Sequence, residues 1–247
     1  SSWSLEPRPS ICRMKRTTQP IVTGTSVVAL KYADGVMMAA DTLGSYGSLA
    51  RFTDLKRLRK FGESTLIGAS GDYSDFQYVS DLLEELVRDN RLSGDAPLSA
   101  REIHRYLTRV MYNRRNKQNP LWNSLVCAGV DEENNPTLGV VDLIGTAYEE
   151  DHLATGFGGH LATPILRKHW RPDLSEKEAR KLLEDCMRVL YYRDCRTMNK
   201  IMFATVKRGE TPATPTIEVS DPVELDTKWD YASFVRPKAA SDTGGSW

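Results

Sequence analysis

The chain lacks an excess of charge of either sign, a long apolar run and a glycosylation sequon. Its 247 residues hold 33 Lys and Arg against 33 Asp and Glu, so the formal net charge is zero and the sequence has no electrostatic footprint for nucleic acid. No apolar run approaches the roughly 20 residues that a membrane helix needs. We therefore expect no nucleic acid and no membrane among the partners of this chain.

Cysteine and histidine are scarce, and neither has the spacing of a metal site. Scattered cysteines and the missing sequon suit a reducing, intracellular compartment rather than a disulfide framework. The glycines at 156–159 precede a helix but lack the remaining residues of a dinucleotide or phosphate-binding loop. We expect no cofactor and no metal. The cysteines and histidines without metal-site spacing are Cys12, Cys127, Cys186, Cys195, His104, His152, His160 and His169.

The two ends of the chain differ in composition from the middle. Residues 1–18 carry basic side chains without an apolar core behind them, which is not the pattern of a secretory signal. Residues 230–247 are rich in Ala, Ser and Gly, which argues against packed structure. We expect an N-terminal extension or pro-segment over 1–18, one domain over 19–229 and a C-terminal tail over 230–247.

The middle of the chain reads as strands, helices and strands again. Helical spacing of apolar residues predicts one helix around Phe76–Leu86, a second around Ile103–Met111, a short one after Gly159 and a long one over 176–192. Strands flanking a central pair of helices predict a single layered α/β domain. Apolar and β-branched runs predict strands at 26–32, 35–41, 64–69, about 124–130, 138–144, 201–206 and 215–219. Capping boxes are expected at Ser74…Gln77, Ser99…Glu102 and Ser175…Glu178.

The Gly24–Thr25 pair, directly before a predicted strand, suggests nucleophilic chemistry. A threonine hydroxyl reacts only when a base takes its proton, and a free N-terminal amine, with a pKa of about 7.7–8.0, can do so. Thr25 has 24 residues before it, so it could react only if the Gly24–Thr25 bond were cut. From the residues alone, the alternative that Thr23–Thr25 is simply the turn before a strand is the simpler one.

Three motifs in the chain are specific enough to compare with known families: Gly35-Val-x-x-Ala-Ala-Asp41, Gly68-Ala-Ser-Gly-Asp72 and Tyr192-Arg193-Asp194. With them the chain resembles the β-type subunits of the 20S proteasome, from about Thr17 to Trp229. The resemblance implies the N-terminal nucleophile hydrolase fold, a four-layer αββα sandwich. Further runs point to a non-catalytic member of the family, namely Leu43–Phe52, Asn119–Asn123, Leu153–Gly158 and Met187–Asp194.

The resemblance assigns catalytic positions residue by residue, and three of them are kept. The nucleophilic threonine of catalytic members falls on Thr25, and their two supporting aspartates fall on Asp41 and Asp194. Because an unmatched buried charge is costly, we expect both carboxylates to act here as ion-pair partners. For Asp194 the expected partner is one of the neighbouring arginines, Arg193 or Arg196.

Three further catalytic positions depart from the family pattern. The lysine falls on Arg57, which is bulkier and cannot lose its proton, and which we expect to pair with Asp41. One serine falls on Phe157, which offers no oxygen. A second serine falls on Thr197, which is followed by Met198–Asn199 where the pattern has glycines. We therefore expect a degenerate site with no catalytic residue.

The resemblance implies a non-catalytic structural subunit, which contributes to ring assembly and to the chamber for ATP- and ubiquitin-dependent protein degradation. It implies α and β subunits as partners in a two-fold stack of heptameric rings, an indirect link to the regulatory particle, and a location in cytoplasm and nucleus. The extension would be trimmed near residues 14–18, and the tail would reach the opposite ring. The alternatives are an active threonine endopeptidase with Thr25 freed, or an unrelated amidohydrolase that acts alone.

Overall fold

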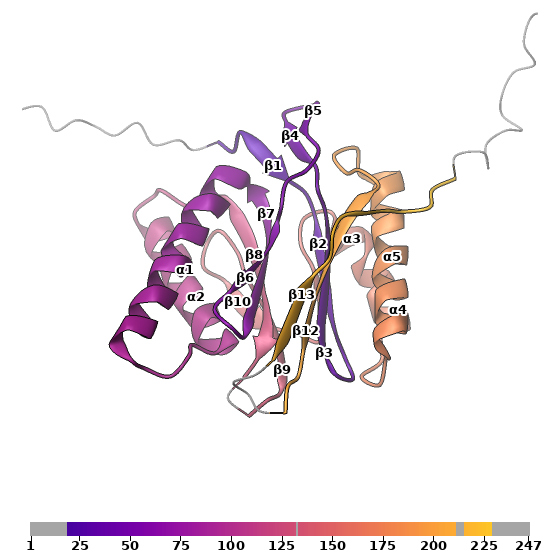
Figure 1. Ribbon diagram of the computed structural model, residues 1–247. Coiled ribbons are helices and arrows are strands. Elements are labelled where there is room, and N and C mark those ends of the chain that lie inside the picture. The colour runs from indigo at the N-terminus through magenta and orange to yellow at the C-terminus, as the bar shows by residue number, and fades with distance from the viewer. Residues whose placement is uncertain (1–18, 132, 211–214, 229–247) are drawn as a thin grey trace, which may run out of the picture.

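Two antiparallel sheets lie face to face, and helices cover the outer face of each, which gives four layers (Figure 1). This arrangement comes from a computed structural model that describes residues 19–131, 133–210 and 215–228. The expected extension 1–18 and tail 230–247 lie outside the described residues. The αββα sandwich expected from the resemblance is therefore confirmed.

The first sheet has eight strands in the order β10-β9-β8-β7-β1-β4-β5, with β6 paired to β7 beside β1. Its strands are β1 (Val22–Gly24), β4 (Gly44–Tyr46), β5 (Leu49–Phe52), β6 (Leu58–Phe61), β7 (Thr65–Asp72), β8 (Asn123–Val130), β9 (Pro136–Val141) and β10 (Ala147–Glu149). The very short strand β1 thus has a neighbour on each side, β7 and β4.

The second sheet has six strands in the order β11-β2-β3-β12-β13, with β14 also paired to β12. Its strands are β2 (Val27–Tyr32), β3 (Gly35–Asp41), β11 (His152–Ala154), β12 (Lys200–Lys207), β13 (Thr216–Val219) and β14 (Val223–Glu224). Both faces of β2 are buried: Val27 and Ala29 point between the sheets, whereas Val28 and Leu30 point toward the outer helices. A strand buried on both faces explains the continuous apolar run in the sequence.

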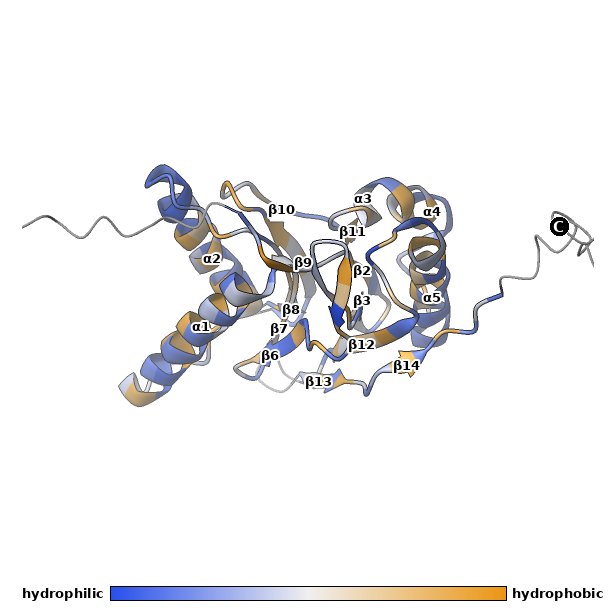
Figure 2. Ribbon diagram, turned by 90° about the horizontal axis from the view of Figure 1, so that it is seen from above, coloured by the Kyte–Doolittle hydropathy of each residue, from blue (hydrophilic) through white to orange (hydrophobic). Residues whose placement is uncertain are grey.

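Five helices form the outer layers: α1 (Tyr73–Ser93) and α2 (Ala100–Asn116) on one side, and α3 (Gly158–Leu161), α4 (Thr163–His169) and α5 (Glu176–Arg193) on the other. Figure 2 shows the two sheets between these helix layers when the molecule is seen from above. Separate apolar clusters fill the three spaces between the layers. No helix among the described residues is both long and apolar enough to cross a membrane.

Two of the three expected capping boxes are confirmed, at Ser99 and Ser175. The third, at Ser74, is wrong, because α1 begins at Tyr73, two residues earlier than a cap at Ser74 requires. Asp72 is its N-cap, and its carboxylate accepts from the backbone amides of Ser74 at 2.8 Å and Asp75 at 3.1 Å. An aspartate at the end of a strand can cap the helix that follows directly, and here it does so in place of the serine.

The longer predicted strands are present, but two have other bounds: β7 runs on to Asp72, beyond the predicted end at 69, and β9 begins at Pro136 instead of 138. The prediction ran from 138 to 144, but β9 stops at Val141. The reason lies in the next residue, because Asp142 accepts from the amides of Ile144 and Thr146 and so turns the chain. The unpredicted strands are all short, with two to four residues each: β1, β4, β5, β6, β10, β11 and β14. Such runs show too little alternation to be recognised.

Candidate functional site

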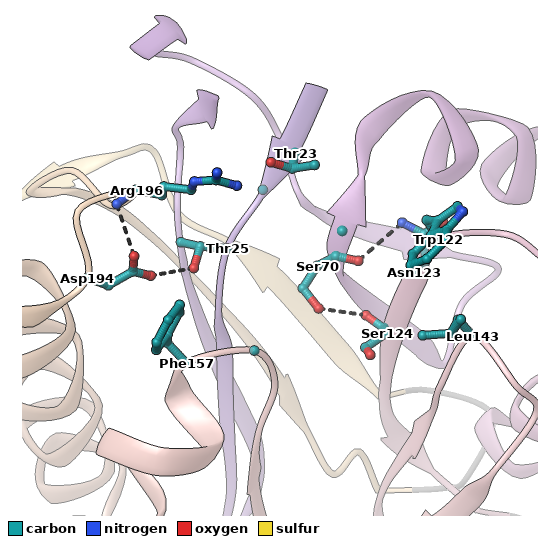
Figure 3. Close-up of a pocket in the computed structure, with 13 residues that line it drawn as sticks. Thr23, Thr25, Ser70, Trp122, Asn123, Ser124, Leu143, Phe157, Asp194 and Arg196 are labelled. Carbon is teal, nitrogen blue, oxygen red and sulfur yellow. Dashed lines mark hydrogen bonds between the residues drawn. The ribbon is translucent and has the colours of Figure 1, made fainter. Parts of the chain in front are cut away.

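Thr25 lies in the short connection between β1 and β2, where the chain leaves the first sheet and enters the second. A cavity of about 300 Å³ opens beside it (Figure 3). One end of this cavity is formed around Thr25 and Asp194, and the other around the facing strands β7 and β8. The lining residues are Thr23, Gly24, Thr25, Ser70, Gly71, Trp122, Asn123, Ser124, Leu143, Gly156, Phe157, Asp194 and Arg196.

Arg57 is buried beneath this site, with 2% of its surface exposed. Its Nε donates to the carbonyl of Asp41 at 3.1 Å, and one Nη donates to the carbonyls of Thr25 at 2.9 Å and Ala69 at 3.0 Å. The other Nη donates to the carbonyl of Ser26 at 3.1 Å and to the Asp41 carboxylate. The expected Arg57–Asp41 pair is confirmed, but most of the guanidinium holds backbone carbonyls from both sheets.

Asp41 is the last residue of β3, and its carboxyl is almost completely buried. Burial raises the pKa of this carboxyl above its ordinary value, and the charge of Arg57 together with the amide of Leu43 offsets part of that rise. Removing either member of the pair would leave an unmatched polar group in the interior. Asp41 therefore acts as the structural counter-ion of Arg57, as the sequence indicated.

Gly24 is required by the position of Arg57. A Cβ atom on Gly24 would stand 2.3 Å from Cδ of Arg57 and 2.9 Å from its Nε, closer than unbonded atoms approach. A side chain at residue 24 would therefore have to displace the guanidinium from its carbonyl partners. The glycine that suggests self-cleavage in the sequence thus has a packing role as well.

Thr25 and Asp194 are joined directly. The Thr25 hydroxyl donates to Oδ2 of Asp194 at 2.5 Å, and the other carboxylate oxygen accepts from the backbone amide of Arg196 at 3.0 Å. The expectation of an Asp194–arginine ion pair is wrong. Asp194 caps the C-terminal end of α5, so the amide two residues further on is the group that comes within its reach.

The two serine positions hold residues that cannot replace a serine at the Thr25 end of the cavity. Phe157 stands directly before α3, lines the cavity and is 59% exposed. The Thr197 hydroxyl donates to the Asp194 carbonyl at 2.9 Å, at the end of α5. The backbone carbonyl of Asn199 accepts from the Leu225 amide at 2.8 Å, a bond that a glycine at this position could also make.

The far wall of the cavity was not predicted from the sequence. The side-chain amide of Asn123 donates to the backbone carbonyls of Ser70 at 3.1 Å and Asp72 at 2.8 Å. The Ser70 hydroxyl donates to the Ser124 carbonyl at 3.2 Å (Figure 3). Ser70 and Asn123 lie just outside the predicted strands 64–69 and 124–130, although both belong to runs that carry the family resemblance, Gly68–Asp72 and Asn119–Asn123. Asn123 stands between Trp122 and Ser124, and nothing local in the sequence shows that its side-chain amide is buried and needs partners.

The three residues directly before Thr25, Val22–Gly24, are part of the first sheet. Thr23 pairs with Ser45 of β4 and with Asp72 of β7, and Gly24 pairs with Gly71. The Ile21 amide also donates to the Asp72 carboxylate at 2.7 Å. The simpler sequence interpretation, a turn at Thr23–Thr25, is therefore wrong for Thr23 and Gly24, which form a strand.

The described residues contain no cluster of three or more His, Cys, Asp or Glu side chains able to hold a metal ion. A family model described as "Proteasome subunit" matches residues 21–206. The chain is 51% identical over 235 residues to the proteasome subunit beta type-4 of Arabidopsis thaliana, covering 94% of this chain and 92% of that protein.

Two further relatives extend this similarity to other lineages. The chain is 48% identical over 222 residues to the proteasome subunit beta type-4 of Dictyostelium discoideum, covering 89% of this chain and 83% of that protein. It is 43% identical over 235 residues to the proteasome subunit beta type-7 of Saccharomyces cerevisiae, covering 90% of this chain and 86% of that protein. The similarity therefore includes nearly all of the described residues.

Proposed function

The chain belongs to the proteasome subunit family, and from that premise we propose that it is a non-catalytic β subunit of the 20S core particle. In this role it contributes to ring assembly and to the wall of the chamber in which proteins are degraded. Its relatives are beta type-4 and beta type-7 subunits, which agrees with the motifs that point to a non-catalytic member.

The observation that carries the non-catalytic role is the hydrogen bonding of Arg57. A guanidinium has five N–H donors and keeps its charge at every pH that a protein survives. Arg57 uses its donors on four backbone carbonyls and one carboxylate. A group bound in this way can neither accept a proton nor turn toward the Thr25 hydroxyl. Arg57 is therefore structural at the position where catalytic relatives carry a lysine.

Phe157 adds a second loss. In catalytic members this position supplies a hydroxyl near the reacting threonine, whereas Phe157 supplies only a ring at the edge of the cavity. Thr25 and Asp194 remain and touch each other, but a threonine hydroxyl needs a base that takes its proton, and in such enzymes this base is a free terminal amine. The alternative, an endopeptidase freed at Gly24–Thr25, would lack both the lysine and this hydroxyl.

The finer assignments follow from family membership and are part of the proposal. The partners are other α and β subunits in a two-fold stack of heptameric rings, with the regulatory particle linked indirectly, in cytoplasm and nucleus. We also propose that the chain is trimmed near residues 14–18 and that residues 230–247 reach the opposite ring. N-terminal sequencing tests the first point, and the level of half-particles after deletion of 230–247 tests the second.

The function is tested by purifying the particle through a tag on this chain and treating it with a threonine-reactive epoxyketone. The chain should elute in a complex far larger than its own 27.8 kDa. Catalytic subunits in the same particle should be labelled, which is the internal control, and this chain should not. Labelling of Thr25 would support the endopeptidase instead, and elution as a lone active chain would support the stand-alone amidohydrolase.

A further inference from the structure

Arg196 brings a positive charge to the cavity beside Thr25, and no carboxylate among the described residues pairs with it. Both oxygens of the neighbouring Asp194 carboxylate are already in use. Oδ2 accepts from the Thr25 hydroxyl, and Oδ1 accepts from the backbone amide of Arg196 itself. Figure 3 shows the Arg196 side chain directed over Thr25 rather than toward the Asp194 carboxylate. The cavity therefore has an exposed cation at one end that lacks a counter-ion in the part of the chain that the structure describes.

Large apolar side chains stand on two sides of the same cavity. Phe157 lies at the Thr25 end, and Trp122 and Leu143 lie at the far wall (Figure 3). Phe157 keeps 59% of its surface exposed, so its ring has area that a ligand can cover. Removing apolar surface from water favours binding. The cavity thus combines one unpaired cation with apolar walls.

The size of the cavity and its hydroxyl groups suit the end of a peptide. Its volume of about 300 Å³ lies at the lower limit of the roughly 300–1,000 Å³ found for ligand pockets, which leaves room for one large side chain and the backbone next to it. Thr23 and Ser124 also line the cavity, and their hydroxyls can donate to or accept from peptide groups. A carboxylate beside an apolar side chain is what the C-terminal residue of a peptide offers.

We propose that this cavity binds short peptides by their C-terminal residue, with the terminal carboxylate on Arg196 and an apolar side chain between Phe157 and Leu143. This inference rests on the proposed function, since hydrolysis of a peptide bond creates a new C-terminal carboxylate and the catalytic subunits of the same particle would supply such products. The chain then holds a product of the reaction without performing any step of it.

Other ligands use only part of the cavity. An inorganic anion such as phosphate would bind Arg196 and leave the apolar walls in water, whereas an uncharged apolar molecule would leave the guanidinium unpaired. A peptide cannot add as a strand between β4 and β7, because β1 already pairs with both. Binding therefore depends on side chains. Because the charge pair is exposed, we expect it to weaken at high salt.

The binding is tested with two photo-crosslinking peptides that differ only in their C-terminal group. Both are N-acetyl-Ala-Ala-p-benzoylphenylalanine, one as the acid and the other as the amide. Particles are purified through a tag on the full chain, treated with an epoxyketone to block the catalytic subunits, irradiated with each probe and analysed by mass spectrometry. The acid should modify this chain at Phe157, Leu143 or Trp122, and the amide about 10-fold less. Equal modification by both probes, or none by the acid, would overturn the inference.

Competition identifies the class of ligand. An excess of unmodified N-acetyl-Ala-Ala-Phe should suppress the modification by the acid probe. The same concentration of inorganic phosphate should not, because phosphate gains nothing from the apolar walls. Equal suppression by phosphate would show a simple anion site and contradict the assignment to peptides.

A single substitution gives an independent readout. Arg196→Gln keeps the backbone amide that bonds to Asp194 and removes only the cation, so it should lower modification by the acid about 10-fold and leave the amide unaffected. Arg193→Gln, at an exposed arginine of α5 that does not line the cavity, is the matched control and should change neither. Modification by the acid that survives Arg196→Gln would contradict the proposal. If the unmodified chain enters no particle, the proposed function itself fails, which is a different result.

Discussion

The hydroxyl of Thr25 donates to the carboxylate of Asp194 at 2.5 Å, and this bond joins the connection between β1 and β2 to the C-terminal end of α5. The resemblance to the family assigns both residues to positions that its catalytic members use. In this chain the bond orients the Thr25 side chain, while Arg57 donates to the backbone carbonyl of Thr25 at 2.9 Å. The hydrogen bond between Thr25 and Asp194 therefore anchors the C-terminal end of α5 to the sheets, which is a structural role.

Restoring a lysine alone is expected to leave the chain inactive. In Arg57→Lys, Phe157 still offers no hydroxyl, and the nitrogen of Thr25 stays in a peptide bond behind β1. Treatment of assembled particles with an epoxyketone, followed by mass spectrometry, should find no adduct on Thr25, while the catalytic subunits of the same particles are modified. An adduct on Thr25 would show that Arg57 was the single missing element.

Gly24→Ala is expected to destabilise the chain by about 2 kcal/mol, since overpacking costs about 1–3 kcal/mol. The new methyl group would stand 2.3 Å from Cδ of Arg57 and would push the guanidinium from its acceptors. Urea unfolding measures the change. Gly159→Ala is the matched control, because its Cβ would meet nothing closer than 3.5 Å. Equal midpoints for the two variants would contradict the packing role of Gly24.

The Asp41–Arg57 pair should show strong coupling in a double-mutant cycle. Breaking a buried pair from one side costs about 3–5 kcal/mol, because the other charge is left without a partner. We expect Asp41→Asn and Arg57→Met each to be destabilising, and the double variant to be much more stable than the sum of both changes predicts. Thermal unfolding of the four chains gives the coupling, and simple additivity would argue against a direct pair.

The N-terminal end of α5 should loosen in acid. Hydrogen bonds from the Ser175 hydroxyl and amide lower the pKa of Glu178 below its ordinary value of 4.5. A carboxyl whose pKa is lowered by folding stabilises the folded state above 4.5, and this contribution disappears as pH falls through the folded pKa. Amide hydrogen exchange in the first turn of α5 should therefore speed up as the pH falls below 4.5, beyond its intrinsic change.

Glu178→Gln should remove that acid dependence, whereas Glu150→Gln, a change at an exposed residue outside the helices, should keep it. A first turn of α5 that is equally protected at pH 3 and pH 6, relative to the unfolded chain, would show that the capping box contributes nothing to the pH response.

Thiol reagents should distinguish the described cysteines. Burial raises the pKa of Cys127 and of Cys186 to about 12, so neither forms the reactive thiolate at neutral pH, whereas Cys195 is exposed. In a Cys12→Ser background, iodoacetamide should modify Cys195 in the native chain and all three thiols only after unfolding. Rapid modification of Cys127 or Cys186 in the native chain would contradict the packing described for β8 and α5.

Interactions between residues close in the sequence could be predicted, whereas those between residues far apart in the sequence could not. The capping box at Ser175 involves residues three apart and was recognisable, whereas Asp72 capping α1 in place of Ser74 required knowing where β7 ends. The Arg57–Asp41 pair followed from the need to match buried charges. The backbone carbonyls that Arg57 holds come from separate strands, and only the folded arrangement of both sheets brings them together.

The same limit applies to the hairpin of β4 and β5, in which Ser45 pairs with Ala50 but Gly44 pairs with Phe52, so that Arg51 is an extra residue that forms a bulge. Alternation along Leu49–Phe52 predicts that Leu49 and Phe52 point in opposite directions. The bulge at Arg51 reverses this, and a single extra residue in one strand leaves no signal in hydrophobicity. Short strands and bulges are set by pairing with neighbours distant in the sequence, so the surfaces that they create are visible only in the structure.

Strand β1 has a consequence for the covalent integrity of the chain. It is the inner strand between β4 and β7, yet it is joined to the second sheet only through the Gly24–Thr25 bond. Were that bond cut, the upstream piece would become a separate peptide ligand of the protein, retained by backbone pairing and by the Ile21 amide on Asp72. Its loss would then be a dissociation, with a rate and an equilibrium constant, and would leave β4 and β7 with open edges.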